Sequence, residues 1–337
     1  MKEALLYQPL TDGRVRCEVC LRRCTVAPGE RGFCRTRKNR DGQFYTLIYD
    51  QVSSAGPDPI EKKPLYHFHP GSRVFSLGSL GCSFTCPGCQ NWQISRMPAG
   101  NDGRAYRATP AQAVEAAIRE GAAGICWTYN EPAIWLEHTL ESARLAKEHG
   151  LYTAYVTNGT ATRAHLDAIG PYLDAYRVDI KAFSREAYRA IAGFSAFEGI
   201  LDSTAYARER WGMHIECVTN VTPTLNDSDD ELRGIAHWIA TALGVDTPWH
   251  VTRFHPCEGF AHLPPTPLAR LDRAVEIARE EGLRYCYVGN VPADLRQHTR
   301  CPSCSHPVIT RQGFSITSND LQHGACPHCG TAIAGRW

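Results

Sequence analysis

The stretch Gly81-Cys82-Ser83-Phe84-Thr85-Cys86-Pro87-Gly88-Cys89-Gln90-Asn91-Trp92 carries three cysteines in a C-x3-C-x2-C pattern. It follows Val74-Phe75-Ser76-Leu77-Gly78, an apolar run that predicts a strand. Three thiolates on one short loop can hold three irons of a four-iron cluster and leave the fourth iron without a protein ligand. A structural zinc site normally has four ligands. The loop therefore predicts a [4Fe-4S] cluster on Cys82, Cys86 and Cys89; the alternatives are a zinc knuckle or three loop cysteines without a function.

The spacing of these cysteines resembles the signature of the radical S-adenosylmethionine (SAM) superfamily. The resemblance implies that the open iron chelates the amino and carboxylate groups of SAM, and that one electron splits SAM to a 5′-deoxyadenosyl radical. Many members carry an aromatic residue between the last two cysteines, where this chain has Gly88. We therefore expect Phe84 or Trp92 to shield the cluster from solvent.

The composition is that of a soluble globular protein. Hydrophobic residues make up 43% and charged residues 21% of the 337 residues. With a net charge of +1, the protein has no strong positive electrostatic field to attract nucleic acid. We therefore do not expect it to bind nucleic acid. No apolar run approaches the roughly 18 residues of a membrane span, and no signal peptide is evident, so we expect a cytoplasmic protein. In that setting the 15 cysteines predict metal and cluster ligation rather than disulfides.

Eight further cysteines fall into two groups near the ends of the chain. The N-terminal group, in a segment predicted to span residues 1–50, has the spacing C-x2-C-x3-C-x9-C, which suits either a zinc site or a second iron–sulfur cluster. The C-terminal group, in residues 298–337, forms two C-P-x-C knuckles, the pattern of a zinc ribbon or a rubredoxin-like iron site. The predicted ligands are Cys17, Cys20, Cys24 and Cys34 at the first site, and Cys301, Cys304, Cys326 and Cys329 at the second.

Residues 66–295 alternate between predicted strands and helices. Apolar strand patterns recur about one helix apart, which indicates βαβ units and an α/β fold with a parallel sheet. Residues 41–73, rich in Gly, Pro and Ser, are interpreted as a connector. Radical SAM relatives form a partial (β/α)6 barrel, and the resemblance implies that architecture here. Ligands of such sheets bind at the carboxyl ends of the strands.

Several predicted strands end in polar residues. The resemblance narrows here to enzymes like the pyruvate formate-lyase activating enzyme, because of the sequence Thr128-Tyr129-Asn130-Glu131-Pro132. It implies that Asn130 and Glu131 contact the SAM amino group and that Asp179 and Lys181 lie near its carboxylate. The remaining strand-end residues predicted to bind the cofactor are Thr157, Asn158, Gly159, Arg253 and His255.

The three-part layout resembles the AmmeMemoRadiSam radical SAM proteins, which occur with two protein partners. It implies a radical SAM enzyme that takes electrons from a low-potential donor and abstracts hydrogen from a protein, as a glycyl-radical activase does, or from a small molecule. The alternatives are a zinc-rich module that binds protein or RNA, and an iron–sulfur electron-transfer protein without radical chemistry.

Overall fold

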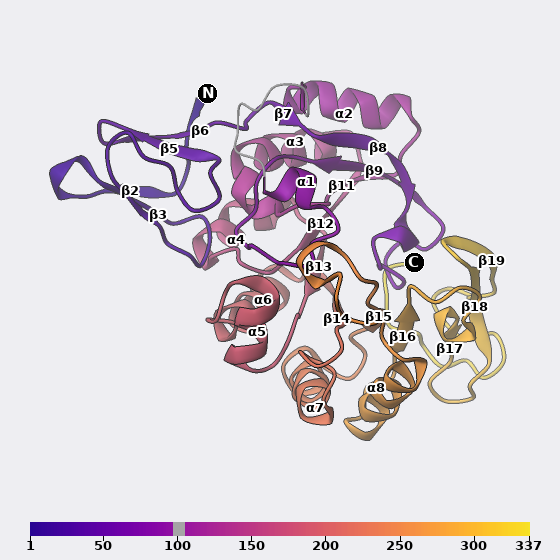
Figure 1. The fold of residues 1–337 in the computed structure, drawn as a ribbon. Helices are drawn as coiled ribbons and strands as arrows, with labels where there is room; N and C mark the ends of the chain where they lie inside the picture. The colour runs from indigo at the N-terminus through magenta and orange to yellow at the C-terminus, as the bar shows by residue number, and fades with distance from the viewer. Residues whose placement is uncertain (97–104) are drawn as a thin grey trace.

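A computed structural model describes residues 1–96 and 105–337. Its centre is an eight-stranded sheet in the order β16-β15-β14-β13-β12-β11-β9-β8. All neighbouring strands from β9 to β16 are parallel, which confirms the predicted α/β class, and β8 is antiparallel to β9. Figure 1 shows these strands following an arc. The strands are β8 (Ser54–Pro59), β9 (Arg73–Gly78), β11 (Gly124–Trp127), β12 (Tyr152–Thr157), β13 (Ala175–Asp179), β14 (His214–Val221), β15 (Trp249–Arg253) and β16 (Cys286–Gly289).

The interpretation of residues 41–73 as a connector was wrong for β8. This strand contains Gly56, Pro57 and Pro59, which read as turn residues, yet it pairs with β9 from Ser54 opposite Gly78 to Pro59 opposite Arg73. An edge strand tolerates proline because one of its sides has no ladder hydrogen bonds to lose. The sheet therefore begins before residue 66, the predicted start of the barrel.

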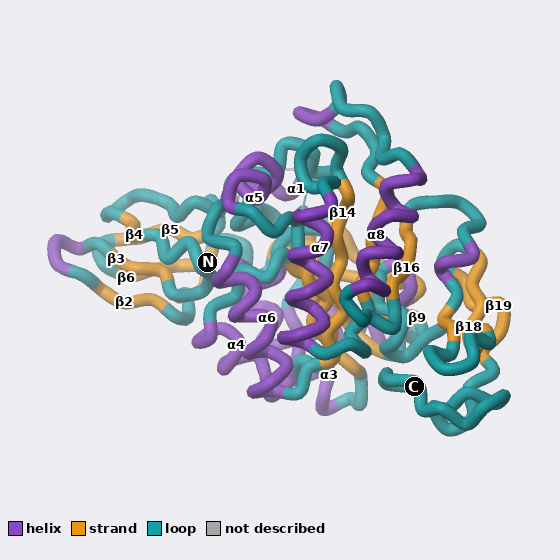
Figure 2. Tube along the Cα trace, turned by 90° about the horizontal axis from the view of Figure 1, so that it is seen from below, coloured by secondary structure: helices purple, strands orange, loops and turns teal. Residues whose placement is uncertain are grey.

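Helices cover the outer side of the arc (Figures 1 and 2). A capping box starts α2: the Thr109 hydroxyl accepts a hydrogen bond from the Gln112 amide, and the Gln112 side chain accepts one from the Thr109 amide. The Ser228 hydroxyl caps α7 by accepting a hydrogen bond from the Glu231 amide. The helices are α1 (Trp92–Ser95), α2 (Pro110–Arg119), α3 (Leu136–Glu148), α4 (Arg163–Ile169), α5 (Arg185–Ala192), α6 (Glu198–Trp211), α7 (Asp229–Trp238) and α8 (Leu268–Glu280).

Short helical turns join the larger elements. Within the described residues, no helix is long and apolar enough to cross a membrane. The turns are Thr11–Gly13, Ile60–Lys62, Pro132–Trp135, Gly170–Tyr172, Ile239–Leu243, Glu258–Phe260 and Leu295–Gln297.

Two small modules lie on opposite sides of the central sheet in both views (Figures 1 and 2). The N-terminal one has two antiparallel sheets, β1-β6-β5 and β2-β3-β4, and the C-terminal one has the sheet β17-β18-β19. These strands are β1 (Lys2–Glu3), β2 (Tyr7–Pro9), β3 (Val15–Cys17), β4 (Thr25–Val26), β5 (Arg37–Arg40), β6 (Gln43–Thr46), β17 (Thr299–Arg300), β18 (Pro307–Gln312) and β19 (Ser315–Asn319); β7 (Gln51–Val52) pairs with β10 (Tyr106–Arg107).

Candidate active site

A cavity of about 410 Å³ opens at the carboxyl ends of the parallel strands. Its walls come mainly from the residues that end or follow the seven parallel strands, which is where ligands bind in parallel α/β sheets. It brings together nine of the residues predicted from the sequence: Cys82, Cys86, Cys89, Asn130, Glu131, Thr157, Asn158, Asp179 and Lys181.

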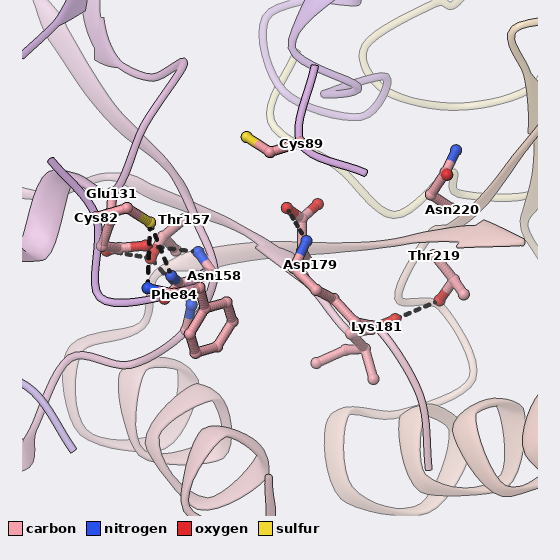
Figure 3. Close-up of polar contacts among 12 residues, drawn as sticks. Cys82, Phe84, Cys89, Glu131, Thr157, Asn158, Asp179, Lys181, Thr219 and Asn220 are labelled. Atoms are coloured by element: carbon pink, nitrogen blue, oxygen red, sulfur yellow. Dashed lines mark hydrogen bonds and ion pairs between the residues drawn. The ribbon is translucent and has the colours of Figure 1, made fainter. Parts of the chain in front are cut away.

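The three cysteines of the loop after β9 are half-buried and free of disulfides, and all three face this cavity. The Phe84 amide lies 3.4 Å and the Asn158 side-chain amide 3.7 Å from the Cys82 sulfur, and both donate toward it (Figure 3). Desolvation raises the pKa of the Cys82 thiol well above its usual value, so the thiolate form needs a metal beside it. Three thiols on one cavity wall, one of them with two amide donors to its sulfur, fit an iron–sulfur cluster.

Asn130 and Glu131 hold the cysteine loop and the end of β12 in place. The Asn130 side-chain amide donates to the Ser79 hydroxyl and to the Gly81 carbonyl, both at 2.9 Å. The buried Glu131 carboxylate accepts hydrogen bonds from the Thr157 hydroxyl at 2.7 Å and the Asn158 amide at 2.8 Å (Figure 3). Burial raises the pKa of Glu131 to about 7. Both side chains therefore use several of their polar atoms to position their neighbours.

Asp179, at the end of β13, lies between two cations. Its carboxylate pairs with Arg177. It also pairs with Lys181 at 3.1 Å (Figure 3). Desolvation alone would raise the pKa of Asp179, but the two cations outweigh it and lower the pKa. Desolvation likewise opposes the charged form of Lys181, but Asp179 and the nearby Cys86 raise its pKa. The group keeps one positive charge in excess on this wall.

Three residues predicted to bind the cofactor do not line the cavity. Gly159 has a φ of +78°, and a β-carbon there would lie 2.5 Å from Ile200, so it faces the packing against α6. The Arg253 Nε atom donates to the Thr266 carbonyl at 2.9 Å. His255 is exposed, with its Nε2 atom 3.4 Å from the Asn290 carbonyl.

The cavity also has walls that the sequence did not predict. Arg177 could have been found, because alternation along a strand places it on the same side as Asp179. Lys63 lies in the segment interpreted as a connector; it is buried and pairs with Asp58 at 2.7 Å. Phe260 carries no local signal. It occupies the space beside Gly88, where a β-carbon would lie 2.6 Å from its ring.

The expectation about shielding was thus incomplete. Phe84 and Phe260 both line the cavity, whereas Trp92 does not. Phe260 reaches the loop because the Gly259 amide donates to the Pro87 carbonyl at 3.1 Å. An aromatic from the loop after β15 therefore fills the place that Gly88 leaves open.

The C-terminal cysteines form a compact group. The Cys301 and Cys329 sulfurs are 3.5 Å apart, and those of Cys304 and Cys326 are 3.7 Å apart. All four sulfurs lie within 4.8 Å of one another, which suits a single tetrahedral metal ion. The N-terminal cysteines surround a separate small pocket.

Comparison with known sequences agrees with this site. The sequence model of the Radical SAM superfamily matches residues 77–239. A protein from Methanocaldococcus jannaschii described as uncharacterized is 39% identical over 336 residues, 99% of each chain. The pyruvate formate-lyase-activating enzyme of Clostridium pasteurianum is 24% identical over 180 residues, 50% of this chain and 72% of the relative.

Two solved structures share the fold. A radical SAM methyltransferase from Sphaerobacter thermophilus matches with a TM-score of 0.50 and 15% identity, covering 66% of this chain and 67% of that one. SuiB from Streptococcus suis bound to S-adenosylmethionine also matches with a TM-score of 0.50, at 12% identity, covering 69% of this chain and 54% of that one.

The parallel sheet and the three-cysteine cavity agree with the match of residues 77–239: the chain contains a domain of the Radical SAM superfamily, whose members are enzymes. Over its whole length, the chain belongs to the same family as the Methanocaldococcus jannaschii protein.

Proposed function

We propose that this protein is a radical SAM enzyme that holds a [4Fe-4S] cluster on Cys82, Cys86 and Cys89 and binds SAM in the cavity beside them. When bound, the cluster and SAM supply a 5′-deoxyadenosyl radical by one-electron reductive cleavage. The observation that carries the proposal is that these three thiols share one cavity with the charged group around Asp179.

The charge of the cavity wall supports an anionic ligand. Of the described residues that line the cavity, four are cations and two are carboxylates, an excess of two positive charges. Lys181 and Arg177 share only the Asp179 carboxylate, so they can also bind the carboxylate of an amino acid such as the methionyl part of SAM. The lining charges are Lys62, Lys63, Arg177 and Lys181 against Glu131 and Asp179.

The size of the cavity bears on the substrate. Its volume of about 410 Å³ is at the small end of the range of about 300–1,000 Å³ for small-molecule sites. SAM would use most of this space, so the group that loses hydrogen enters at the rim, beside Asn290 and Phe314. Such an entrance suits a residue on a partner protein, as in activation of a glycyl-radical enzyme. It also suits an extended small molecule.

The proposed reaction also involves an electron donor, partner proteins and a second metal site. A low-potential electron donor must supply the electron for SAM cleavage. The three-part arrangement resembles that of the AmmeMemoRadiSam radical SAM proteins, and we include their two protein partners among the candidates for the macromolecular substrate. A zinc or iron ion at the four C-terminal cysteines completes the proposed set of cofactors.

The test is anaerobic SAM cleavage. The protein is reconstituted with iron and sulfide, then mixed with SAM and dithionite, and 5′-deoxyadenosine is quantified. The Cys82→Ala/Cys86→Ala/Cys89→Ala variant should form none. The Cys257→Ala variant is the matched control, since Cys257 lies beside the same loop with its sulfur 3.7 Å from the Cys89 carbonyl, and it should keep the wild-type rate. Product from the triple variant, or bound SAM without product in the wild type, would contradict the proposal.

A further inference from the structure

The four N-terminal cysteines surround one pocket that is otherwise lined mainly by apolar side chains. Cys17 ends β3, Cys20 and Cys24 stand in the turn before β4, and Cys34 precedes β5. Cys17 and Cys20 are buried, and none of the four forms a disulfide. The apolar walls are Val19, Phe33, Phe44 and Ile134. Four free thiols in an apolar pocket indicate a metal centre.

The spacing of the sulfurs distinguishes this pocket from the C-terminal site. A zinc–sulfur bond of about 2.3 Å places the four sulfurs of a tetrahedral site about 3.8 Å apart. Among the residues that the structure describes, the C-terminal cysteines alone form a group of three or more ligands within 4.8 Å. No three of the N-terminal sulfurs are that close.

The cysteines of the cluster loop likewise form no such compact group. Cys82, Cys86 and Cys89 also face one cavity without meeting the 4.8 Å limit. An iron–sulfur cluster holds its thiolates farther apart than a single ion does, because several irons and sulfides stand between them. By this measure the N-terminal pocket resembles the cluster loop and differs from the C-terminal site.

The N-terminal cysteine pocket and the cluster loop are adjacent in the structure. Ser83, the neighbour of Cys82, is part of the wall of the N-terminal pocket. Gly81, on the other side of Cys82, has a φ of +81°, and a β-carbon there would lie 2.6 Å from the Cys34 carbonyl oxygen. Only glycine therefore lets the chain that leads into Cys82 pass so close to Cys34.

Backbone hydrogen bonds fix the N-terminal loop to the wall of the active site. The Leu21 amide donates to the Thr160 carbonyl at 2.8 Å, and the Thr162 amide donates to the Val19 carbonyl at 3.2 Å. Cys20 and Ala161 form an antiparallel bridge between these bonds. This partner segment, residues 160–162, begins two residues after Asn158, whose side chain contacts both Cys82 and Ser83. The contact is thus continuous from one group of cysteines to the other.

Arg22 and Arg37 place positive charge beside the N-terminal cysteines. Arg37 is buried and pairs with Glu137 at 2.7 Å. Arg22 lies 3.5 Å from the centre of the Phe33 ring and donates to the carbonyls of Ser83 and Gly193. Arg22 therefore joins the pocket to the cluster loop and offsets the charge of thiolates at both.

We propose that Cys17, Cys20, Cys24 and Cys34 bind an iron–sulfur cluster that passes electrons to the cluster on Cys82, Cys86 and Cys89; the second half of this inference rests on the proposed function. One electron from a low-potential donor protein of the ferredoxin class reduces the N-terminal cluster and leaves the donor oxidised by one electron. The N-terminal cluster then returns to its oxidised state by giving that electron to the second cluster. No bond is formed or broken, and no proton moves in this step.

The first test asks whether the N-terminal site holds a cluster when the active-site cysteines are absent. The Cys82→Ala/Cys86→Ala/Cys89→Ala variant of the full chain is reconstituted with iron and sulfide. Inorganic sulfide should remain bound, with an electron paramagnetic resonance signal after reduction by dithionite. Adding Cys20→Ala and Cys24→Ala should abolish both. Zinc, or iron without sulfide, in the triple variant would overturn the cluster assignment.

The second test follows the electron. The Cys20→Ala/Cys24→Ala variant with its active-site cysteines intact is mixed with reduced ferredoxin, and reduction of the remaining cluster is followed by freeze-quench spectroscopy. The rate should fall at least tenfold, whereas the Cys126→Ala/Cys217→Ala variant, which alters two buried cysteines outside both pockets, should match the wild type. An unchanged rate would overturn the relay.

Circular dichroism establishes that the variants are folded before either comparison. Sulfide retained by the triple variant, combined with a wild type that cleaves no SAM, would refute the proposed function and leave the N-terminal cluster standing. The two proposals can therefore fail separately.

Discussion

Lys181 is the residue through which the charge of the cavity wall can be tested. Its ammonium group is 3.1 Å from Asp179 and is half-buried, so its removal leaves Asp179 with Arg177 alone. Lys181→Met keeps the length of the side chain and removes the cation. SAM affinity, measured anaerobically by equilibrium dialysis, should fall by about tenfold, the loss of one charge-assisted contact worth about 1.5 kcal/mol.

A surface lysine provides the control for Lys181. Lys147 also pairs with an aspartate, Asp174, at 2.8 Å, but far from the cavity wall. Lys147→Met should leave SAM affinity unchanged. Equal affinities for the Lys181→Met variant and the wild type would show that the excess charge does not hold the ligand.

His165 gives the protein a pH-dependent stability. Both ring nitrogens are buried, and neither has a hydrogen-bond partner among the described residues. Burial lowers the pKa of His165 from 6.5 to about 3. Below about pH 6.5, His165 binds a proton in the unfolded chain but stays neutral in the folded chain. The free energy of unfolding therefore decreases as the pH falls below that value.

His165→Leu should remove this dependence. Between about pH 7.5 and pH 5.5, the free energy of unfolding should fall by about 1 kcal/mol less in the variant than in the wild type. Chemical denaturation at the two pH values measures the difference. His149→Leu, at the exposed end of α3, should behave as the wild type does. An equal fall in the free energy of unfolding in the His165→Leu variant and the wild type would contradict the assignment of this pH dependence to His165.

At the scale of elements, the loop after β15 completes the cluster loop after β9. Phe260 packs on Gly88, and the ion pair between Arg96 and Glu258 at 3.4 Å joins the two loops. Phe260→Ala should open the cluster loop to solvent and speed the loss of iron in air several-fold, as followed by the visible absorbance. Gly88→Phe alone should collide with Phe260, whereas the double variant should recover slow iron loss. Identical rates in the Phe260→Ala variant and the wild type would show that Phe260 is not the shield.

The same loops explain which parts of the site could be predicted. The cysteine motif is local in sequence and follows a predicted strand, and the resemblance pointed to Asp179 and Lys181; all of these residues line the cavity. Phe260 comes from a loop far along the chain, and its contact with Gly88 exists only after β15 has joined the sheet. The edge strand β8 was missed because its prolines indicate a turn unless its position at the edge is known.

Strand-end position alone was a weaker guide to the cavity. Gly159, Arg253 and His255 end or follow strands as Asn158 and Asp179 do. Gly159 nevertheless packs toward α6, and Arg253 donates to the Thr266 carbonyl. The predicted α/β class with a parallel sheet was correct, because helix and strand periodicities are local properties of the sequence.

At the scale of the whole molecule, the C-terminal module is bound to the central domain by buried polar contacts. Arg311 of β18 is buried and donates to the Tyr66 carbonyl at 2.9 Å, and His67 contacts the Ala334 carbonyl at 2.6 Å. The hairpin between β18 and β19 carries Phe314, which is half exposed and lines the cavity rim. A partner that reaches the cavity by this side therefore meets the C-terminal module.

Arg311 should couple the stability of the C-terminal module to that of the segment around Tyr66. Its guanidinium also donates to the Gln297 carbonyl and the Thr299 hydroxyl, and lies 3.9 Å from the buried Glu61 carboxylate. Arg311→Met leaves Glu61 buried without its cation, which costs about 3–5 kcal/mol in comparable sites. Hydrogen–deuterium exchange should then quicken both in residues 307–319 and in residues 60–67. Arg300→Met, an exposed change in the same module, should leave both segments at wild-type rates. Faster exchange confined to residues 307–319 would mean that the module opens alone, and that the rim formed by Phe314 moves independently of the cavity wall.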